Sequence, residues 1–269
     1  MSEAAVLTEV VDGVLVVTIN RPEAKNAANG EVARGIAAAM DELDGNDALR
    51  VGILTGAGGT FCAGMDLKGF LTGDLPIVEG RGFAGVAEAP PRKPLIAAVE
   101  GYALAGGFEL AITCDLIVAA ETSKFGITEV KRGLVAAGGG LVRLPRQIPP
   151  RLAMEFAIVG DFVTAGRAYD MGLVNRVVPL ADLEKESMRV ARRLALVPAL
   201  SLKLNKKAIN NIWEQSGLRE ALTHNAGLVA IIHTTDVPEW QRFRKIQEQH
   251  GFKAFLEARD KPFRDLDGK

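Results

Sequence analysis

The stretch Val99-Glu-Gly-Tyr-Ala-Leu-Ala-Gly-Gly-Phe-Glu-Leu110 carries the strongest structural signal in this chain. It continues from an apolar strand-like run at 95–99, and its two adjacent glycines precede a short helical pattern at 108–113. The first N–H groups of a helix have no intrahelical partner and lie at the positive end of its dipole, so they can point at an anion. Glu109 comes three residues after Gly106, which makes the two neighbours on one helix face. The stretch therefore predicts a backbone donor beside a carboxylate, although a buried structural glutamate is the alternative.

Two further segments could contribute chemistry. Glu129 follows a short strand-like run at 125–127, and two carboxylates in one apolar pocket suit general acid–base catalysis. A surface glutamate at a strand end is the alternative. In Gly59-Thr-Phe-Cys-Ala-Gly-Met-Asp-Leu-Lys68, small residues let a ligand approach the backbone, and Asp66 can begin a helix. An ordinary strand-to-helix turn explains that segment equally well.

Working outward, strands alternate with helices over the first two thirds of the chain. Asp12-Gly13 lies between two apolar runs and predicts a β-hairpin. Long apolar β runs between helical segments indicate an α/β fold with buried sheets. We expect strands at 6–11, 14–20, 51–54, 95–99, 116–119, 125–127 and 173–178, a loop at 102–107, and helices at 31–43, 108–113, 151–158 and 165–171. From residue 180 onward the pattern is helical only, with helices expected at 181–197, 201–214, 218–232 and 236–258.

Composition excludes several classes of protein. The 269 residues are 48% hydrophobic and 24% charged, which rules out wholesale disorder. The formal net charge of -1 provides no basic field for nucleic acid or an anionic membrane. The most apolar stretch, 95–120, contains three acids, which a membrane span rarely accepts. Two cysteines make no disulfide framework and the first residues do not resemble a signal peptide, so we expect a cytoplasmic protein.

The motifs of other catalytic classes are absent or weak. His224, His233 and His250 all lie in the helical tail without metal-ligand spacing, and no Gly-x-Ser-x-Gly elbow accompanies them. The chain has no P-loop for nucleotide phosphates. One Gly-x-Gly-x-x-Gly match, at 80–85, lacks the long helix of a dinucleotide site, so a surface loop or short helix is expected there.

Taken together, these segments resemble the crotonase, or enoyl-CoA hydratase/isomerase, superfamily. The resemblance runs in order through nearly the whole chain. Its motifs are Asn20-Arg-Pro-Glu-Ala-Lys-Asn-Ala27, Phe61-Cys-Ala-Gly-Met-Asp-Leu67, Val99 to Leu110, Phe125-Gly-Ile-Thr-Glu129, Gly138-Gly-Gly140, Leu144-Pro145, Ala168-Tyr-Asp-Met-Gly-Leu-Val-Asn-Arg-Val-Val178 and Ala254-Phe-Leu-Glu257.

The resemblance implies a spiral of stacked ββα turns in residues 1–199, and a C-terminal helical region in residues 200–269 that drives assembly into a homotrimer or homohexamer. It implies an acyl-CoA thioester as substrate, with no metal or redox cofactor. The implied oxyanion-hole donors are the N–H groups of Met65 and Gly106. The substrate-binding positions that it implies are Ala24, Lys25, Ala63, Asp66, Leu67 and Lys68.

Members of the superfamily that keep two glutamates at the positions of Glu109 and Glu129 are hydratases. The resemblance therefore implies an enoyl-CoA hydratase, which adds water to a trans-2-enoyl-CoA. Thr128 departs from the pattern, because many hydratases have proline there, and Lys131-Arg132 follows the second acid. The basic pair is either surface charge or a sign of a polar acyl group. Alternatives are an enoyl-CoA isomerase, a hydro-lyase like carnitinyl-CoA dehydratase, and a non-catalytic or RNA-binding relative.

Overall fold

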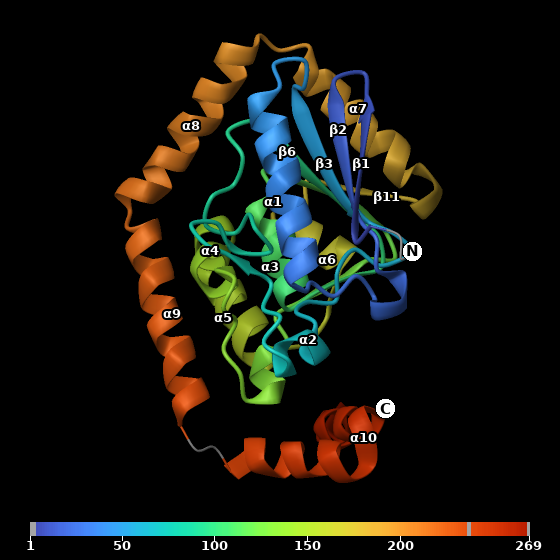
Figure 1. The fold of residues 1–269 in the computed structure, drawn as a ribbon, viewed down its shortest axis with the longest axis vertical. Helices are drawn as coiled ribbons and strands as arrows, with labels where there is room; N and C mark the ends of the chain where they lie inside the picture. Colours follow the sequence, from blue (N-terminus) through green and yellow to red (C-terminus); the bar gives the residue numbers. More distant parts are fainter. Residues whose placement is uncertain (1–3, 236–237, 268–269) are drawn as a thin grey trace.

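The computed structural model describes residues 4–235 and 238–267, which form an α/β structure around a six-stranded sheet (Figure 1). The strand order is β1-β2-β3-β6-β8-β11, with β1 antiparallel to β2 and every other neighbouring pair parallel. These strands are β1 (Val6–Val11), β2 (Val14–Ile19), β3 (Val51–Gly56), β6 (Leu95–Val99), β8 (Leu116–Ala120) and β11 (Arg176–Val178). Two smaller sheets consist of β4 (Ile77–Val78) with β5 (Gly82–Phe83), and of β10 (Val163–Thr164), β9 (Lys124–Gly126) and β7 (Tyr102–Leu104).

Helices surround the main sheet and extend beyond it (Figure 1). The α-helices are α1 (Gly30–Gly45), α2 (Leu67–Leu71), α3 (Gly106–Thr113), α4 (Gly140–Gln147), α5 (Pro150–Val159), α6 (Ala165–Asp170), α7 (Leu183–Ala195), α8 (Ala199–Gln215), α9 (Leu218–Thr234) and α10 (Pro238–Asp267). Three 3₁₀ turns are η1 (Pro22–Ala24), η2 (Glu129–Arg132) and η3 (Leu180–Asp182). The α/β class predicted from the apolar pattern is confirmed.

The inner strands β2, β3, β6 and β8 of the main sheet are largely buried, which explains their nearly continuous apolar sequences. The edge strand β1 is exposed except at its two ends. Leu15 and Val17 of β2 join the larger hydrophobic cluster, which includes residues of α1. Val14 of the same strand faces the other cluster with Leu183 and Val190 of α7. The hairpin prediction is confirmed, because β1 and β2 pair around Asp12-Gly13, where both residues have positive φ.

The second sheet positions the segments that carry Glu109 and Glu129 next to each other. β7 and β9 run parallel, with Leu104 opposite Gly126. Helix α3 begins two residues after β7, and η2 begins three residues after β9. Because parallel strands end at the same edge of a sheet, the N-terminus of α3 and the turn η2 lie at one edge.

Several local expectations were wrong. Residues 102–104 form β7 rather than part of a loop, because β9 and its own neighbour β10 supply the hydrogen bonds that make a sheet. The segment 80–85, expected to be a surface loop or a short helix, consists of turns around the two-residue strand β5. Helix α4 at Gly140–Gln147 was not foreseen. The last main-sheet strand is shorter than expected, at Arg176–Val178. The helix expected at 236–258 includes residues 236 and 237, which lie outside the described part of the chain; α10 is observed from Pro238 and changes direction at Gly251, where φ is 82°.

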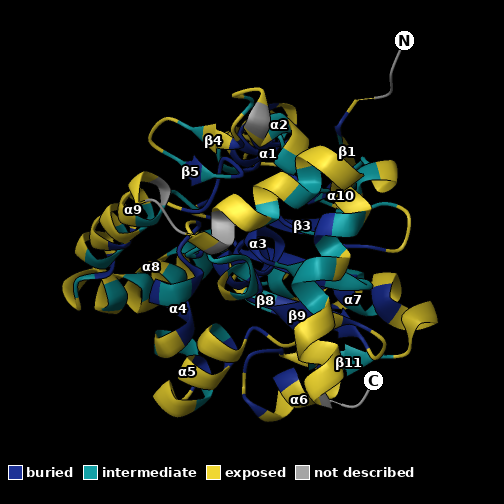
Figure 2. Ribbon diagram, turned by 90° about the horizontal axis from the view of Figure 1, so that it is seen from below, coloured by how far each residue is buried: buried dark blue, intermediate teal, exposed yellow. Residues whose placement is uncertain are grey.

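The C-terminal helices differ from the rest of the fold. α8 and α9 run along the outside of the molecule, and α10 crosses beneath it (Figure 1). No residue of α8 is buried, and much of α9 is exposed (Figure 2). Large apolar side chains are among the exposed residues of both helices. Those side chains include Leu200, Leu204, Ile209, Ile212, Leu228 and Ile231. Within residues 4–235 and 238–267, no helix has the length and apolar character needed to cross a membrane.

Candidate active site

Helix α3 carries two of the predicted site residues, Gly106 and Glu109. All eight of its residues are buried, and Glu109 is only 2% exposed. The helix packs so closely on the neighbouring loop that a Cβ at Gly107 would lie 2.0 Å from the carbonyl oxygen of Cys62. The residue before the helix, Ala105, has a φ of 53°, an unusual value for a residue with a side chain. Close packing and a strained turn together hold the start of α3 in one place.

The N–H groups of Met65 and Gly106 lie close together at this place. A Cβ built on Gly64, the residue before Met65, would be 3.4 Å from the nitrogen of Gly106. Among the hydrogen bonds of the described residues, neither Met65 N–H nor Gly106 N–H has an acceptor. Buried backbone donors are nearly always paired, so two neighbouring free donors indicate a site for an oxygen atom of a ligand.

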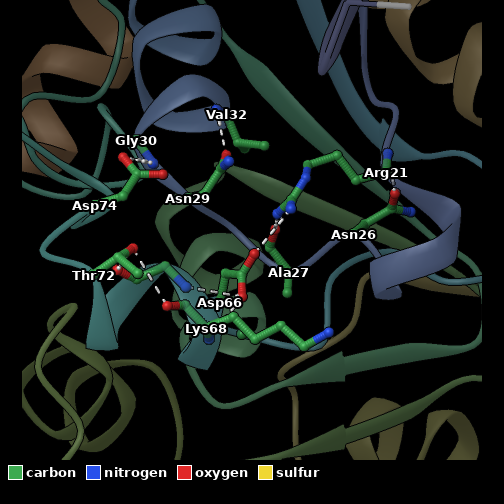
Figure 3. Close-up of polar contacts among 12 residues, drawn as sticks. Arg21, Asn26, Ala27, Asn29, Gly30, Val32, Asp66, Lys68, Thr72 and Asp74 are labelled. Carbon is green, nitrogen blue, oxygen red and sulfur yellow. Dashed lines mark hydrogen bonds and ion pairs between the residues drawn. The ribbon is translucent and has the colours of Figure 1, made fainter. Parts of the chain in front are cut away.

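The loop that carries Met65 is fixed by a network that begins at Arg21 (Figure 3). The Arg21 guanidinium donates to the Asp66 carboxylate at 2.9 Å and to the carbonyl oxygen of Ala27 at 2.6 Å. Asp66 also caps α2, because its other oxygen accepts from the N–H groups of Lys68 and Gly69. The guanidinium and these N–H bonds oppose the effect of partial burial, and the pKa of Asp66 is lowered. The prediction that Asp66 begins a helix is confirmed.

The other predicted substrate-binding positions lie along the same loop. The carbonyl oxygen of Lys25 accepts the N–H of Ala63 at 3.0 Å, which brings Ala24 and Lys25 next to the Met65 loop. Leu67 is half-buried and Lys68 is exposed at the start of α2. The structure therefore gathers all six predicted positions around one loop that runs from the site to the surface.

Glu109 accepts a hydrogen bond from a distant segment. The N–H of Gly140 donates to Glu109 Oε1 at 2.7 Å, and a Cβ at Gly138 would lie 2.7 Å from Oε2. Burial, and secondarily the negative charge of Glu129, raises the pKa of the Glu109 carboxyl. The donor to this carboxylate is Gly140 N–H, which was not predicted from the sequence, whereas the predicted neighbour Gly106 lies one helical turn away in α3.

Glu129 stands at the first position of η2, after Thr128. Burial also raises the pKa of its carboxyl, against the opposing charge of Arg132. Glu129 Oε2 and Thr128 Oγ1 are both buried without a hydrogen-bond partner in the described part of the chain. Buried polar atoms usually have partners, so these two atoms leave hydrogen-bonding capacity for a ligand or a water molecule. Because the negative charge of Glu129 raises the pKa of Glu109, the two carboxyls titrate as a pair and not independently.

Phe83 is a site residue that the sequence did not reveal. A Cβ at Gly106 would lie 2.4 Å from Phe83 Cζ, and one at Gly138 would lie 3.2 Å from Phe83 Cδ1. The ring therefore covers the first residue of α3 and the segment that approaches Glu109. The only local signal was the glycine-rich run at 80–85, which indicated a loop without saying what the loop covers.

The Lys131-Arg132 pair divides into two environments. Lys131 forms an ion pair with Asp161 and lies 4.7 Å from the ring centre of Phe263 in α10. Arg132 is half-buried, and its Nε has no partner in the described part of the chain. Nearby in α10, Arg259 pairs with Asp260, while its buried Nη1 has no hydrogen-bond partner among the described residues. The end of the site beyond Glu129 thus carries two guanidinium groups.

Other chemistries find little support in the geometry. Within the described residues, no group of three or more His, Cys, Asp or Glu side chains could hold a metal ion. Cys62 and Cys114 are buried and free, and burial raises the pKa of the Cys62 thiol to about 11, so it is a poor nucleophile near neutral pH. The groups that the site itself presents are two carboxyls and two backbone donors.

Comparison with known proteins agrees with this geometry. Residues 9–266 match the family model described as enoyl-CoA hydratase/isomerase. The chain is 40% identical over 253 residues to enoyl-CoA hydratase EchA19 of Mycobacterium tuberculosis, covering 90% of this chain and 85% of that protein. The crystal structure of enoyl-CoA hydratase EchA1 from Mycobacterium marinum is 47% identical with a TM-score of 0.77, covering 95% of this chain and 97% of that one.

A third relative represents a neighbouring branch. The structure of a carnitinyl-CoA dehydratase from Mycobacterium avium is 35% identical with a TM-score of 0.84, covering 89% of this chain and 95% of that one. These matches span nearly the full chain, and they confirm both the superfamily resemblance and the fold that it implied. The chain belongs to the enoyl-CoA hydratase/isomerase family.

Proposed function

We propose that this protein is an enoyl-CoA hydratase that adds water reversibly to a trans-2-enoyl-CoA to give a 3-hydroxyacyl-CoA. The observation that carries the proposal is the juxtaposition of the buried Glu109 and the half-buried Glu129 with the N–H groups of Met65 and Gly106, which have no acceptor among the described residues. A double-bond isomerisation needs a proton shuttle but no second group to position water. Two carboxyls of raised pKa beside two backbone N–H donors therefore suit the addition of water better than isomerisation.

The mechanism follows from the groups present. The thioester carbonyl oxygen accepts hydrogen bonds from Met65 N–H and Gly106 N–H, which stabilise the enolate-like charge that develops on it. Glu109 and Glu129 position the water, and ionised Glu109 takes its proton as the oxygen attacks C3. Protonated Glu129 delivers a proton to C2, and dehydration is the reverse. A pair of coupled carboxyls that holds one proton supplies both the base and the acid.

The substrate brings its own coenzyme A, so the proposed reaction needs no metal and no redox cofactor. We assign Ala63, Asp66, Leu67 and Lys68 to the thioester and pantetheine, because they follow the donor at Met65 toward the surface. Ala24 and Lys25 lie beside that path, and we assign them to the adenine end. The salt bridge between Arg21 and Asp66 stabilises the loop that carries Met65.

Two guanidinium groups near Glu129 argue against one alternative substrate. A carnitinyl group carries a quaternary ammonium. The carboxylate of Asp260 offsets only one of the charges of Arg132 and Arg259, and the remaining positive charge would repel that ammonium. A neutral or anionic acyl group avoids this repulsion. The proposed substrate is therefore an enoyl-CoA without a cationic head group.

The C-terminal helices support assembly of the chain into oligomers. α8 and α9 expose Leu200, Ile209, Ile212 and Ile231 at 59–70% of their surface, more apolar surface than a solitary helix pair usually presents. We propose that residues 200–269 form the oligomerisation region and that the protein assembles as a homotrimer or homohexamer. The chain's net charge of -1 gives no support to an RNA-binding role. Its two cysteines are buried and free, which is compatible with the reducing environment of a cytoplasm.

The test of the proposed function is loss of the enoyl-thioester absorbance when purified protein meets crotonyl-CoA, 2-decenoyl-CoA and crotonobetainyl-CoA, with product identified by mass. Formation of 3-hydroxyacyl-CoA from the neutral substrates is expected. Migration of the double bond without a mass increase of one water would identify an isomerase instead. Preference for crotonobetainyl-CoA would favour the carnitinyl-CoA dehydratase branch.

A further inference from the structure

Arg143 of α4 carries a buried charge that the mechanism above does not use. The residue is 5% exposed, and no ion pair joins it to a carboxylate of the described residues. Its guanidinium instead donates to two carbonyl oxygens, that of Gly138 at 3.4 Å and that of Ala87. Burying a guanidinium is costly, so its position calls for an explanation beyond packing.

The two carbonyls belong to the two segments that enclose Glu109. Gly138 begins the turn whose Gly140 N–H donates to Glu109 Oε1 at 2.7 Å. Ala87 lies four residues after Phe83, whose ring covers Gly106 and Gly138. One side chain therefore ties the turn that holds the carboxylate to the segment that covers the oxyanion donor.

The charge of Arg143 also acts on Glu109. The carboxylates that face Arg143 are Glu109 of α3, Glu88 of the 82–88 segment and Glu214 of α8, and Glu109 has the largest effect. Glu88 and Glu214 are exposed, whereas Glu109 is buried. Glu109 in turn faces the negative charge of Glu129, beside which stands Arg132. Water screens the exposed pairs, so Arg143 exerts its charge mainly on Glu109.

We propose that Arg143 is a positioning residue for hydration, which fixes the Gly138–Gly140 turn against Glu109 and favours the ionised form of that carboxyl. The proposal rests on the proposed role of Glu109 as the base. The Arg143 side chain contributes in two ways. Its guanidinium holds the turn through two hydrogen bonds, and its positive charge stabilises the ionised form of Glu109.

The experiment compares Arg143→Met and Arg143→Lys with the wild type over pH 5 to 10, measuring kcat and KM with crotonyl-CoA. Loss of the charge raises the pKa of Glu109, so in Arg143→Met the acid limb of the kcat profile should move to higher pH by about one unit. We expect kcat near neutral pH to fall by about 10- to 100-fold with little change in KM, because a displaced base loses reactivity but not substrate binding. Arg143→Lys keeps the charge and should restore the limb while recovering only part of kcat.

Arg146→Met is the matched control. Arg146 lies on the same helix and also donates to carbonyl oxygens, those of Val142 at 2.7 Å and Ser216 at 3.4 Å. It has no hydrogen bond to the Gly138–Gly140 turn among the described residues. This variant should keep the wild-type pH profile.

A loss of kcat by the same factor at every pH in Arg143→Met, with the acid limb unmoved, would overturn the proposal and leave only a structural role. The titration of Glu109 can be read without turnover, by ¹³C NMR of carboxyl-labelled protein with Glu109→Gln for assignment. The proposal is supported if the pKa of Glu109 is unchanged in Arg143→Lys and raised in Arg143→Met. It is refuted if the pKa of Glu109 is the same in both variants. If Arg143→Met does not fold, Arg143→Gln replaces it in both measurements. Failure of the wild type to hydrate any enoyl-CoA would refute the proposed function instead, and the NMR result would still decide the charge effect.

Discussion

Glu109 and Glu129 are the same residue type in one site, but the two sides of the site hold them differently. Glu109 lies in a fully buried helix, accepts a hydrogen bond from Gly140 N–H and faces the buried Arg143. Glu129 lies in a single 3₁₀ turn, and one of its oxygens has no partner among the described residues. Helix α10 packs against that turn from the C-terminal end of the chain.

This difference suggests a division of labour. A base that must meet one water molecule gains from a fixed position, because a small misplacement of a reacting group is costly. An acid that delivers a proton to C2 needs a free oxygen atom and enough room for acyl groups that differ. The Glu109 side therefore provides precision and the Glu129 side provides adaptability, and each prediction below tests that contrast.

The largest effect is expected from Glu109→Gln. The amide oxygen can still accept from Gly140 N–H, so the fold of the turn is kept, but the side chain cannot take a proton from water. We expect kcat for crotonyl-CoA hydration to fall by about 10³-fold or more, with acyl-CoA affinity nearly unchanged. Stopped-flow absorbance and calorimetric titration with a non-reactive acyl-CoA measure the two quantities. Near-normal turnover would remove Glu109 from the mechanism.

Glu129→Gln should cost less, about 10²-fold in kcat, because solvent can replace a proton donor on the less enclosed side more readily than it can replace the base. The double variant Glu109→Gln/Glu129→Gln should be hardly slower than Glu109→Gln, since the two groups act as a unit. Equal losses in the two single variants would contradict the contrast between the two sides. Losses that multiply in the double variant would show that the acids act independently.

Gly64→Ala tests how tightly the backbone is packed around the N–H donors on the Glu109 side of the site. The new Cβ would lie 3.0 Å from Ala105 Cβ and 3.1 Å from the carbonyl oxygen of Leu104, and φ at this position is +108°. Relief of these contacts moves the N–H groups of Met65 and Gly106 apart, so kcat should fall by up to about 10²-fold, within the range for loss of one oxyanion donor. Gly172→Ala is the control, because its φ is +81° and no atom lies within 4 Å of the new Cβ. Equal kcat losses in the two variants would mean that backbone strain alone is responsible.

The smallest effect concerns stability. Burial raises the pKa of Glu109 above its ordinary value of 4.5, so the unfolded chain ionises this group at lower pH than the folded protein does. Stability is therefore lost as pH rises from the ordinary pKa through the raised one. Glu109→Gln has no such group, so it should melt a few degrees above the wild type at pH 9, at about 2–4 °C per kcal/mol, and close to it at pH 5.

Calorimetry at the two pH values checks the sign. Glu129→Gln should behave in the same way, because burial raises its pKa too. A Glu109→Gln variant that is less stable than the wild type at pH 9 would mean that the ionised carboxylate is stabilising in the folded state. That outcome would contradict the inference that burial of the ionised Glu109 carboxylate destabilises the folded protein.

Much of the fold was predictable because the signals are local. The Asp12-Gly13 turn, the apolar strands of the main sheet and the helical spacing of α1 each depend on neighbouring residues. Glu109 and Glu129 were also identified as candidates from the sequence, Glu109 in a helical pattern after two glycines and Glu129 after a strand-like run, but their meeting in one site was not determined by spacing. Their motifs then indicated the family, and nearly full-length matches confirm it.

The sequence by itself determined which residues can do the chemistry: two glutamates, two glycine-rich turns with free N–H groups, and a C-terminal third made only of helices. Only the tertiary structure decided how they meet. Gly140 donates to a carboxylate 31 residues away, and Arg143 reaches a carbonyl 56 residues away. Phe83 covers Gly106 because β5 folds over α3, which no local pattern encodes. Such contacts depend on packing between distant segments, and neither residue spacing nor hydrophobic periodicity records that packing.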